Sequence, residues 1–211
     1  MQVKLNWATR ITILRILLII PFVICMLNMN DESLSVAAGD ILRYVAVIIY
    51  LVMAVSDGLD GYLARSRGQI TKLGVFLDPV ADKLLMTSAA LLLASSRASV
   101  PNFLLPTTVV VFILGKDVLL VIGFVIVYFI TGKIHIRTVF VGKLTTALQF
   151  VMVAAILIAP EASRLVSGWV WFLRILWWSA ASAAVLATLV YIRDGSRYIE
   201  QYEQTDYTDH R

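Results

Sequence analysis

The sequence predicts an all-α, polytopic membrane protein with about six transmembrane helices. Of its 211 residues, 60% are hydrophobic and only 15% are charged, and the mean hydropathy of +0.85 is far above that of a soluble domain. Long apolar runs recur along the chain, and most approach the twenty or so residues that a membrane-spanning helix needs. The two-residue alternation of barrel strands is absent, and so is any longer repeat.

Six apolar runs define the expected helices. The second and fifth runs are short, and the second is completed by a segment that continues to Arg65. The runs cover about residues 11–29, 41–56, 74–95, 106–130, 143–159 and 169–192. We expect residues 1–197 to form one six-helix transmembrane domain that holds the site described below. Residues 198–211 are polar and lack an apolar period, so we expect a cytoplasmic tail that is partly disordered.

Lysine and arginine residues gather at alternate ends of these runs. Because loops rich in lysine and arginine stay in the cytoplasm, these ends and both termini are expected to be cytoplasmic. The cations concerned are Lys4, Arg10, Arg65, Arg67, Lys72, Lys133, Arg137, Lys143, Arg193 and Arg197. An alternative is that the first run is a signal peptide cleaved among the small residues at 35–39, although its length and the acidic stretch that follows disfavour this.

The net charge of +4 does not require a nucleic-acid partner. The cations lie in short loops, where they set orientation and attract anionic lipid headgroups, and the sequence contains no RNA- or DNA-binding motif. The expected location is therefore a membrane, and we take it to be a bacterial cell membrane.

Four aspartates interrupt the apolar pattern. A charged side chain near the bilayer centre costs roughly 2.5 to 3.5 kcal/mol to insert, so carboxylates kept there need a bound cation or another function. Asp57 and Asp60 are three residues apart and Asp78 and Asp82 are four apart, so each pair shares one face of a helix. With no histidine or cysteine nearby, the ligands are all oxygen, which suits Mg²⁺ or Mn²⁺ better than Zn²⁺ or copper.

The segment from Asp57 to Asp82 resembles the signature of the CDP-alcohol phosphotransferase family at all eight positions. These positions are Asp57, Asp60, Gly61, Ala64, Arg65, Gly74, Asp78 and Asp82. Eight matches at fixed offsets arise by chance in about one in a hundred million chains of this length. The resemblance implies the fold of that family, with the site at the cytoplasmic ends of the second and third helices.

The resemblance also implies a reaction. Family members transfer the phosphoryl-containing group of a CDP-linked donor, usually CDP-diacylglycerol, to an alcohol and release CMP. By resemblance, Asp57, Asp60 and Asp78 are ligands of two Mg²⁺ or Mn²⁺ ions, and two such ions about 3.5 to 4 Å apart can clamp a diphosphate. Asp82 is the general base for the attacking hydroxyl and lies close to one metal.

Four further positions of the motif are assigned to the donor. Gly61, Ala64 and Gly74 are small enough for a cytosine ring or a phosphate to lie against the helix backbone. Arg65 is a permanent cation suited to a diphosphate. Taken singly, each of these residues is more typical of helix packing or of a membrane boundary, and only their joint spacing favours the catalytic interpretation.

Candidate acceptor residues have weaker support. Thr12 and Arg15, at three-residue spacing in the first helix, resemble a family motif of asparagine, threonine and arginine in which Thr9 takes the asparagine position. Lys143, in a segment that resembles one from the same family, lies with Arg137 on a cytoplasmic loop and suits an acceptor phosphate.

Our main interpretation is transfer from CDP-diacylglycerol to glycerol 3-phosphate, which gives phosphatidylglycerophosphate and CMP. Synthesis of cardiolipin from phosphatidylglycerol is the alternative, and it is favoured by the intramembrane pair Lys116 and Asp117, which either neutralise each other or face a polar cavity. Inositol phosphate and serine stay open as acceptors. A divalent-cation transporter or an inactive scaffold is an alternative of another class, and a homodimer through the small residues 179–184 is also open.

Overall fold

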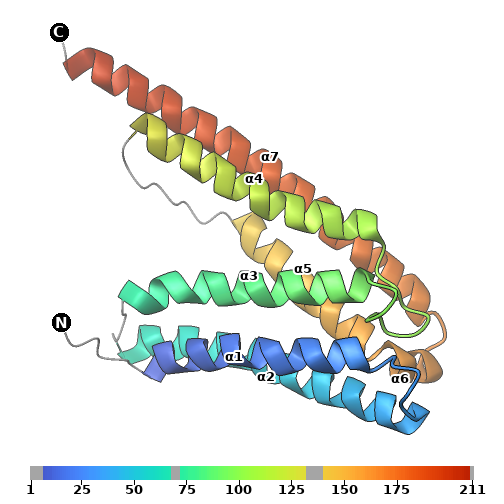
Figure 1. The fold of residues 1–211 in the computed structure, drawn as a ribbon. Coiled ribbons are helices and arrows are strands. Elements are labelled where there is room, and N and C mark those ends of the chain that lie inside the picture. The colour runs from blue at the N-terminus through green and yellow to red at the C-terminus, as the bar shows by residue number, and fades with distance from the viewer. Residues whose placement is uncertain (1–6, 68–71, 132–139, 210–211) are drawn as a thin grey trace. The chain divides into compact units, whose positions relative to one another are not determined.

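The structure is a computed structural model, and it describes the backbone of residues 7–67, 72–131 and 140–209, with side chains for residues 10–56, 77–130 and 141–200. Within these ranges every regular element is a helix, which confirms the all-α class. The chain divides into two compact units (Figure 1). Unit 1 comprises Met1–Leu105 and Val153–Val170, and unit 2 comprises Pro106–Met152 and Trp171–Arg211. The prediction of one catalytic domain over residues 1–197 stays a prediction.

Three long helices build most of unit 1. They are α1 (Trp7–Asn28), α2 (Val36–Arg67) and α3 (Lys72–Ala94), and α1 packs against both of the others (Figure 1). Buried residues recur every three or four positions, so each helix turns one stripe toward its neighbours. Phe22 of α1 and Tyr50 of α2 meet between the stripes, with ring centroids 6.1 Å apart.

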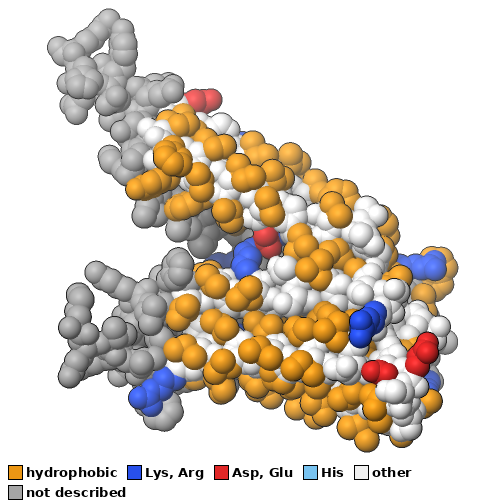
Figure 2. Space-filling model, viewed as in Figure 1, with side chains coloured by type: hydrophobic (Ala, Val, Ile, Leu, Met, Phe, Trp, Pro, Cys, Tyr) orange, Lys and Arg blue, Asp and Glu red, His pale blue; other side chains and the backbone are white. Residues whose placement is uncertain are grey.

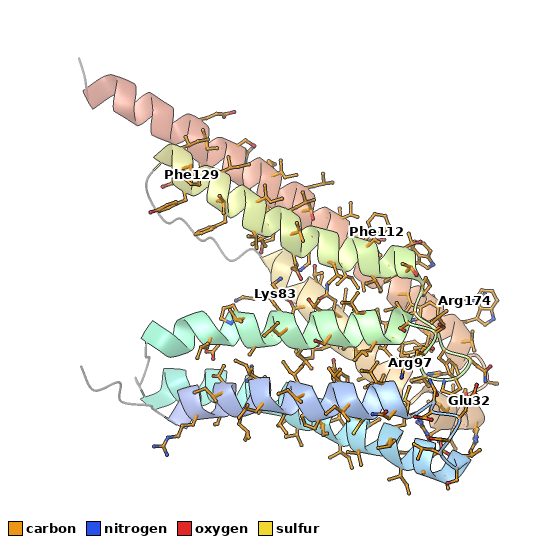
Figure 3. The ribbon with its side chains drawn as sticks, in the orientation of Figure 1. Glu32, Lys83, Arg97, Phe112, Phe129 and Arg174 are labelled. Carbon is orange, nitrogen blue, oxygen red and sulfur yellow. The ribbon has the colours of Figure 1, made fainter. Side chains whose placement is uncertain are left out.

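The loops at one end of unit 1 are joined by an asparagine side chain. Asn30, just after α1, donates hydrogen bonds from its Nδ2 to the carbonyls of Arg97 (3.1 Å) and Ser99 (2.8 Å), which follow α3. Figure 3 labels Glu32 and Arg97 in these two loops, at the same end of the unit. The α1–α2 and α3–α4 connections are therefore fixed to each other at the end away from the Asp57 to Asp82 motif.

A break between two helices is held by a buried arginine. The helix α5 (Phe140–Leu157) ends before Ile158, and the chain bends by 75° into the short helix α6 (Ala159–Leu165), which begins with Pro160 near its first position. Arg43 of α2 donates one hydrogen bond to the carbonyl of Leu157 (3.1 Å) and two to the carboxylate of Glu161 (2.8 and 2.5 Å). The guanidinium thus occupies the negative end of α5 and joins it to α6 and α2.

Unit 2 consists of α4 (Thr107–Thr131), most of α5 and α7 (Trp169–Asp209). Small residues bring α5 and α7 together: a side-chain carbon added at Gly142 would overlap the Tyr191 hydroxyl, and Thr145 Oγ1 donates a hydrogen bond of 3.2 Å to the Ala183 carbonyl. Gly168, just before α7, has a φ of +102°, a conformation that glycine adopts without a steric penalty.

Four of these helices are long and apolar enough to cross a membrane, namely α1, α2, α4 and α7, and the bent pair of α5 and α6 is a fifth candidate. Hydrophobic side chains cover most of the coloured surface in Figure 2, and the few charged ones are scattered over it. The chain is an integral membrane protein. Within the described residues, α3, whose first half contains Asp78, Asp82 and Lys83, is not among the candidates, so the count of six spans stays a prediction.

The polar C-terminal segment differs from its expected structure. We expected partial disorder after residue 197, but α7 continues without interruption to Asp209. Glu200, Gln201, Glu203 and Gln204 have good helix propensity. Adding a residue to an existing helix also costs much less than starting a new one. The apolar run of α7 therefore acts as the nucleus for a polar extension.

Candidate active site

The first half of the predicted motif lies on the last turns of α2. The backbone is helical through Arg67, so Asp57, Asp60, Gly61, Ala64 and Arg65 are all helical positions. The side chains of Asp57, Asp60, Ala64 and Arg65 lie outside the described residues, and so do the surroundings of Gly61 and of Gly74 in α3.

The register of α2 relates these positions to the interior of unit 1. Described buried residues of α2 follow a spacing of four and three: Gly39, Arg43, Ala46, Tyr50 and Met53. The same spacing continues to positions 57, 60 and 64. The backbone of α2 thus puts two aspartates and an alanine of the motif in line with the stripe that packs against α1.

The second half of the motif lies on α3. Asp78 and Asp82 are one turn apart, in line with the buried residues Leu85, Ala89 and Leu92, and both are partly buried. Pro79 follows Asp78 inside the helix. Because proline has no N–H and its ring crowds the preceding turn, the hydrogen-bond ladder of α3 lacks one bond here.

A contact between α1 and α3 connects two sequence predictions. The Thr12 side chain is fully buried, and its Oγ1 lies 2.6 Å from Oδ1 of Asp78, 66 residues away. An ionised carboxylate can only accept hydrogen bonds, so the threonine hydroxyl is the donor. The structure therefore places Thr12 against a motif aspartate.

Sequence reasoning missed Tyr50 as part of this region. Its side chain is almost completely buried, on the stripe of α2 that continues to positions 57, 60 and 64. Tyr50 lies seven residues before Asp57, which is two turns of α2. This spacing was the signal in the sequence that could have identified it.

The other predicted acceptor residues belong to different units of the structure. Arg15 is fully buried on the inner stripe of α1 in unit 1, whereas Lys143 is exposed near the start of α5 in unit 2. Arg137 lies outside the described residues. Their assignment to the acceptor stays a prediction.

The intramembrane pair in α4 is an ion pair. Lys116 Nζ lies 2.7 Å from Oδ1 of Asp117, and the two side chains are only 5% and 15% exposed. Adjacent residues on a helix point about 100° apart, so the long lysine side chain must fold back to reach its neighbour. This geometry agrees with mutual neutralisation of the two charges, one of the two interpretations that the sequence left open.

The donor chemistry of the motif fits a divalent cation. All four acidic positions offer carboxylate oxygens, the preferred ligands of Mg²⁺ and Mn²⁺. Among the described side chains, no group of three or more histidine, cysteine, aspartate or glutamate residues could hold a metal ion. Asp78 and Asp82 belong to that described part, whereas the side chains of Asp57 and Asp60 do not.

Comparison with known proteins extends the resemblance over most of the chain. The family model for CDP-alcohol phosphatidyltransferases matches residues 5–191. A Bacillus subtilis protein named CDP-diacylglycerol--glycerol-3-phosphate 3-phosphatidyltransferase is 33% identical over 170 residues, which is 77% of this chain and 81% of the relative.

Relatives of the same name share a shorter segment. The proteins of Haemophilus influenzae and Escherichia coli K12 are 37% and 38% identical over 94 and 89 residues, covering 44% and 42% of this chain and 46% and 44% of their own lengths. Since the family model covers nearly the whole described chain and the Bacillus relative most of it, the chain belongs to the CDP-alcohol phosphatidyltransferase family.

Proposed function

We propose that this chain transfers the phosphatidyl group of CDP-diacylglycerol to glycerol 3-phosphate and releases phosphatidylglycerophosphate and CMP. Membership of the family makes it a transferase of phospholipid biosynthesis. The choice of glycerol 3-phosphate is supported chiefly by the Bacillus relative, which carries that acceptor in its name and aligns with 77% of this chain. None of the relatives compared above is named for cardiolipin synthesis, which makes phosphatidylglycerol the weaker acceptor hypothesis.

The motif provides the groups that this reaction needs. Asp57, Asp60 and Asp78 would hold two Mg²⁺ or Mn²⁺ ions, and the metal, when bound, neutralises the donor diphosphate and stabilises the leaving phosphate oxygen. Asp82 accepts the proton of the acceptor hydroxyl as the oxygen attacks the phosphorus that carries the diacylglycerol. The bond between that phosphorus and the oxygen of CMP breaks, and CMP leaves.

The donor is held by the remaining motif positions. Gly61, Ala64 and Gly74 let the nucleotide approach the backbone of α2 and α3, because a larger side chain would occupy that space. Arg65 supplies a fixed positive charge for the diphosphate. The buried stripes of α2 and α3 support this assignment, since positions 57, 60, 78 and 82 continue them in register.

The acceptor phosphate is proposed to bind cations near the cytoplasmic side. Glycerol 3-phosphate is a dianion, and Lys143, Arg137 and Arg15 are the candidate partners. The small residues 179–184 do not support a homodimer, because Ala180, Ala181, Ala183 and Ala184 are buried within the chain itself.

The site and both termini are proposed to face the cytoplasm, because loops rich in lysine and arginine are retained there. Cysteines introduced singly at Ser33 and Ser66 test this orientation in intact cells. A membrane-impermeant thiol reagent should label the first and not the second. Labelling of the residue at 66 from outside would reverse the assignment.

An acceptor panel tests the reaction. Purified protein in detergent receives CDP-diacylglycerol and Mn²⁺ or Mg²⁺, and glycerol 3-phosphate, phosphatidylglycerol, inositol phosphate and serine are offered separately. Metal-dependent release of CMP with glycerol 3-phosphate is the expected result. Activity with phosphatidylglycerol alone would identify a cardiolipin synthase, and absence of CMP release with every acceptor would favour the transporter or scaffold.

A further inference from the structure

We propose that Thr12 is a positioning residue that orients the Asp78 carboxylate for metal binding, rather than a contact of the acceptor. This inference rests on the proposed function, because it assigns Thr12 a role in the same metal-dependent site. It begins from the hydrogen bond between Thr12 Oγ1 and Asp78 Oδ1, which at 2.6 Å is within the range of strong bonds to a carboxylate.

The Thr12 hydroxyl differs from those of Thr145, Thr146 and Thr188 in the kind of acceptor that it meets. Thr145, Thr146 and Thr188 each donate to the carbonyl four residues earlier in their own helix, at 2.8, 3.2 and 3.0 Å. Such local bonds are the usual way in which a threonine hydroxyl is satisfied inside a helix. Thr145 also donates to the Ala183 carbonyl of α7 (3.2 Å), whereas Thr12 of α1 meets a carboxylate of α3.

Burial makes this contact specific. Thr12 has no exposed surface and stands on the same stripe of α1 as the fully buried Arg15 and Phe22. A buried β-branched side chain has few rotamers available, so its hydroxyl is held in a fixed direction. The donor that meets Asp78 is therefore placed in advance, before any ligand arrives.

Asp78 is a position where such support is needed. Pro79 follows it in α3, and a residue before proline is pushed away from helical geometry while the helix loses a hydrogen bond. The helix by itself thus holds the Asp78 backbone less firmly than an uninterrupted helix would. The bond from α1 supplies a second attachment, directly on the carboxylate.

The bond occupies one of the two carboxylate oxygens of Asp78. Oδ1 accepts the hydrogen bond of Thr12, and a carboxylate held in one orientation is better placed to bind a metal ion. Hydrogen-bond partners that orient a metal-binding side chain typically contribute about ten-fold to a hundred-fold in metal affinity or activity. Loss of the Thr12 hydroxyl should therefore appear first as weaker metal binding.

The experiment compares Thr12→Val, which keeps the shape and removes the hydroxyl, with Thr12→Ser, which keeps the hydroxyl. Thr188→Val is the matched control, because it removes a helical threonine hydroxyl that bonds only within α7 in the contacts given above. Mn²⁺ binding is measured by the EPR signal of free Mn²⁺ during titration of the purified protein, without and with CMP. Steady-state kinetics at a series of Mn²⁺ concentrations accompany the binding data.

We expect Thr12→Val to weaken Mn²⁺ binding by about ten-fold to a hundred-fold, with activity largely recovered at saturating Mn²⁺ and an unchanged Michaelis constant for glycerol 3-phosphate. Thr12→Ser and Thr188→Val should bind Mn²⁺ as the wild type does. Equal Mn²⁺ affinity in Thr12→Val and the wild type would overturn the inference, and so would a change confined to the Michaelis constant of the acceptor.

Two further outcomes separate this inference from the proposed function. If Thr12→Val does not fold, Thr12→Ala makes the same test with a smaller side chain; failure of both, beside a folded Thr12→Ser, would make the hydroxyl a folding determinant and overturn the positioning role. A wild-type protein that neither binds Mn²⁺ nor releases CMP would refute the proposed function, and the inference with it. A wild type that does both, beside an unaffected Thr12→Val, refutes the inference alone.

Discussion

The buried guanidinium of Arg43 donates a hydrogen bond of 3.1 Å to the main-chain carbonyl of Leu157, which the break after α5 leaves without a helical partner. The same guanidinium is paired with Glu161 across the break, and the Tyr44 hydroxyl donates to that carboxylate as well (2.8 Å). One side chain of α2 thus fixes the angle between α5 and α6.

Arg43→Met should therefore lower the thermal unfolding midpoint of the purified protein. The variant keeps most of the apolar stem but leaves a buried carbonyl unsatisfied, a cost of roughly 1 to 3 kcal/mol. Arg164→Met, which removes an exposed arginine of α6, is the control and should unfold at the wild-type temperature. Equal midpoints for the two variants would show that the clamp is not needed for stability.

The motif aspartates should separate into two kinetic classes. Asp57→Asn and Asp78→Asn are expected to remove nearly all transfer activity without loss of helical content, because each loses a charged metal ligand at constant volume. Asp82→Asn should lower the turnover number about a hundred-fold to ten-thousand-fold while donor binding is nearly kept, as expected for a general base.

Glu32→Gln is the control for these variants, since this exposed carboxylate lies in the loop at the other end of unit 1 (Figure 3). It should leave the kinetics unchanged. If Asp82→Asn weakened donor binding as much as turnover, Asp82 would be mainly a ligand and not the base.

The Lys116 and Asp117 pair should tolerate joint replacement better than single replacement. Removing one partner of a buried pair costs roughly 3 to 5 kcal/mol, because the other charge loses its counter-ion, whereas two apolar residues are often neutral. Lys116→Met should thus lower the unfolding midpoint, and Lys116→Met with Asp117→Leu should largely restore it. Restored stability without transfer activity would instead assign the pair to a functional cavity.

The acceptor assignment of Lys143 is tested by Lys143→Gln. Loss of one charge-assisted contact to a phosphate is worth roughly 1.5 to 3 kcal/mol, so the Michaelis constant for glycerol 3-phosphate should rise about ten-fold to a hundred-fold. The constant for CDP-diacylglycerol should hardly change. Arg174→Gln, an exposed position near the start of α7, is the control, and unchanged kinetics in Lys143→Gln would remove this residue from the acceptor site.

The crossing of α5 and α7 depends on the absence of a side chain at Gly142. A methyl group there would overlap the Tyr191 hydroxyl, which lies at the far end of its side chain, so Gly142→Ala should destabilise the protein by about 1 kcal/mol, the lower end of overpacking costs. In the Tyr191→Phe background the overlapping atom is gone, and the same change should cost less. A double-mutant cycle of unfolding midpoints measures this difference, and additive effects would argue against the close contact.

Much of this protein could be read from local sequence features. Hydrophobic runs predicted the all-α class, the approximate bounds of α1 to α5 and the start of α7. This was possible because a helix in a bilayer satisfies its backbone hydrogen bonds within one contiguous segment. The family was identifiable from Asp57 to Asp82 because offsets of three and four residues are a local property of a helix. Such offsets need no knowledge of distant parts of the chain.

Other features required the tertiary structure. The bond from Thr12 to Asp78 spans 66 residues and the clamp from Arg43 to Glu161 spans 118, and no local period relates either pair. The contact between the rings of Phe22 and Tyr50, 6.1 Å apart, likewise joins two helices and follows from no local period. The sequence by itself determined which helices form and which acidic groups they carry, because these depend on neighbouring residues. Only the packing of α1 against α2 and α3 decided which buried polar groups meet. Those contacts depend on how helices that are distant in sequence lie side by side.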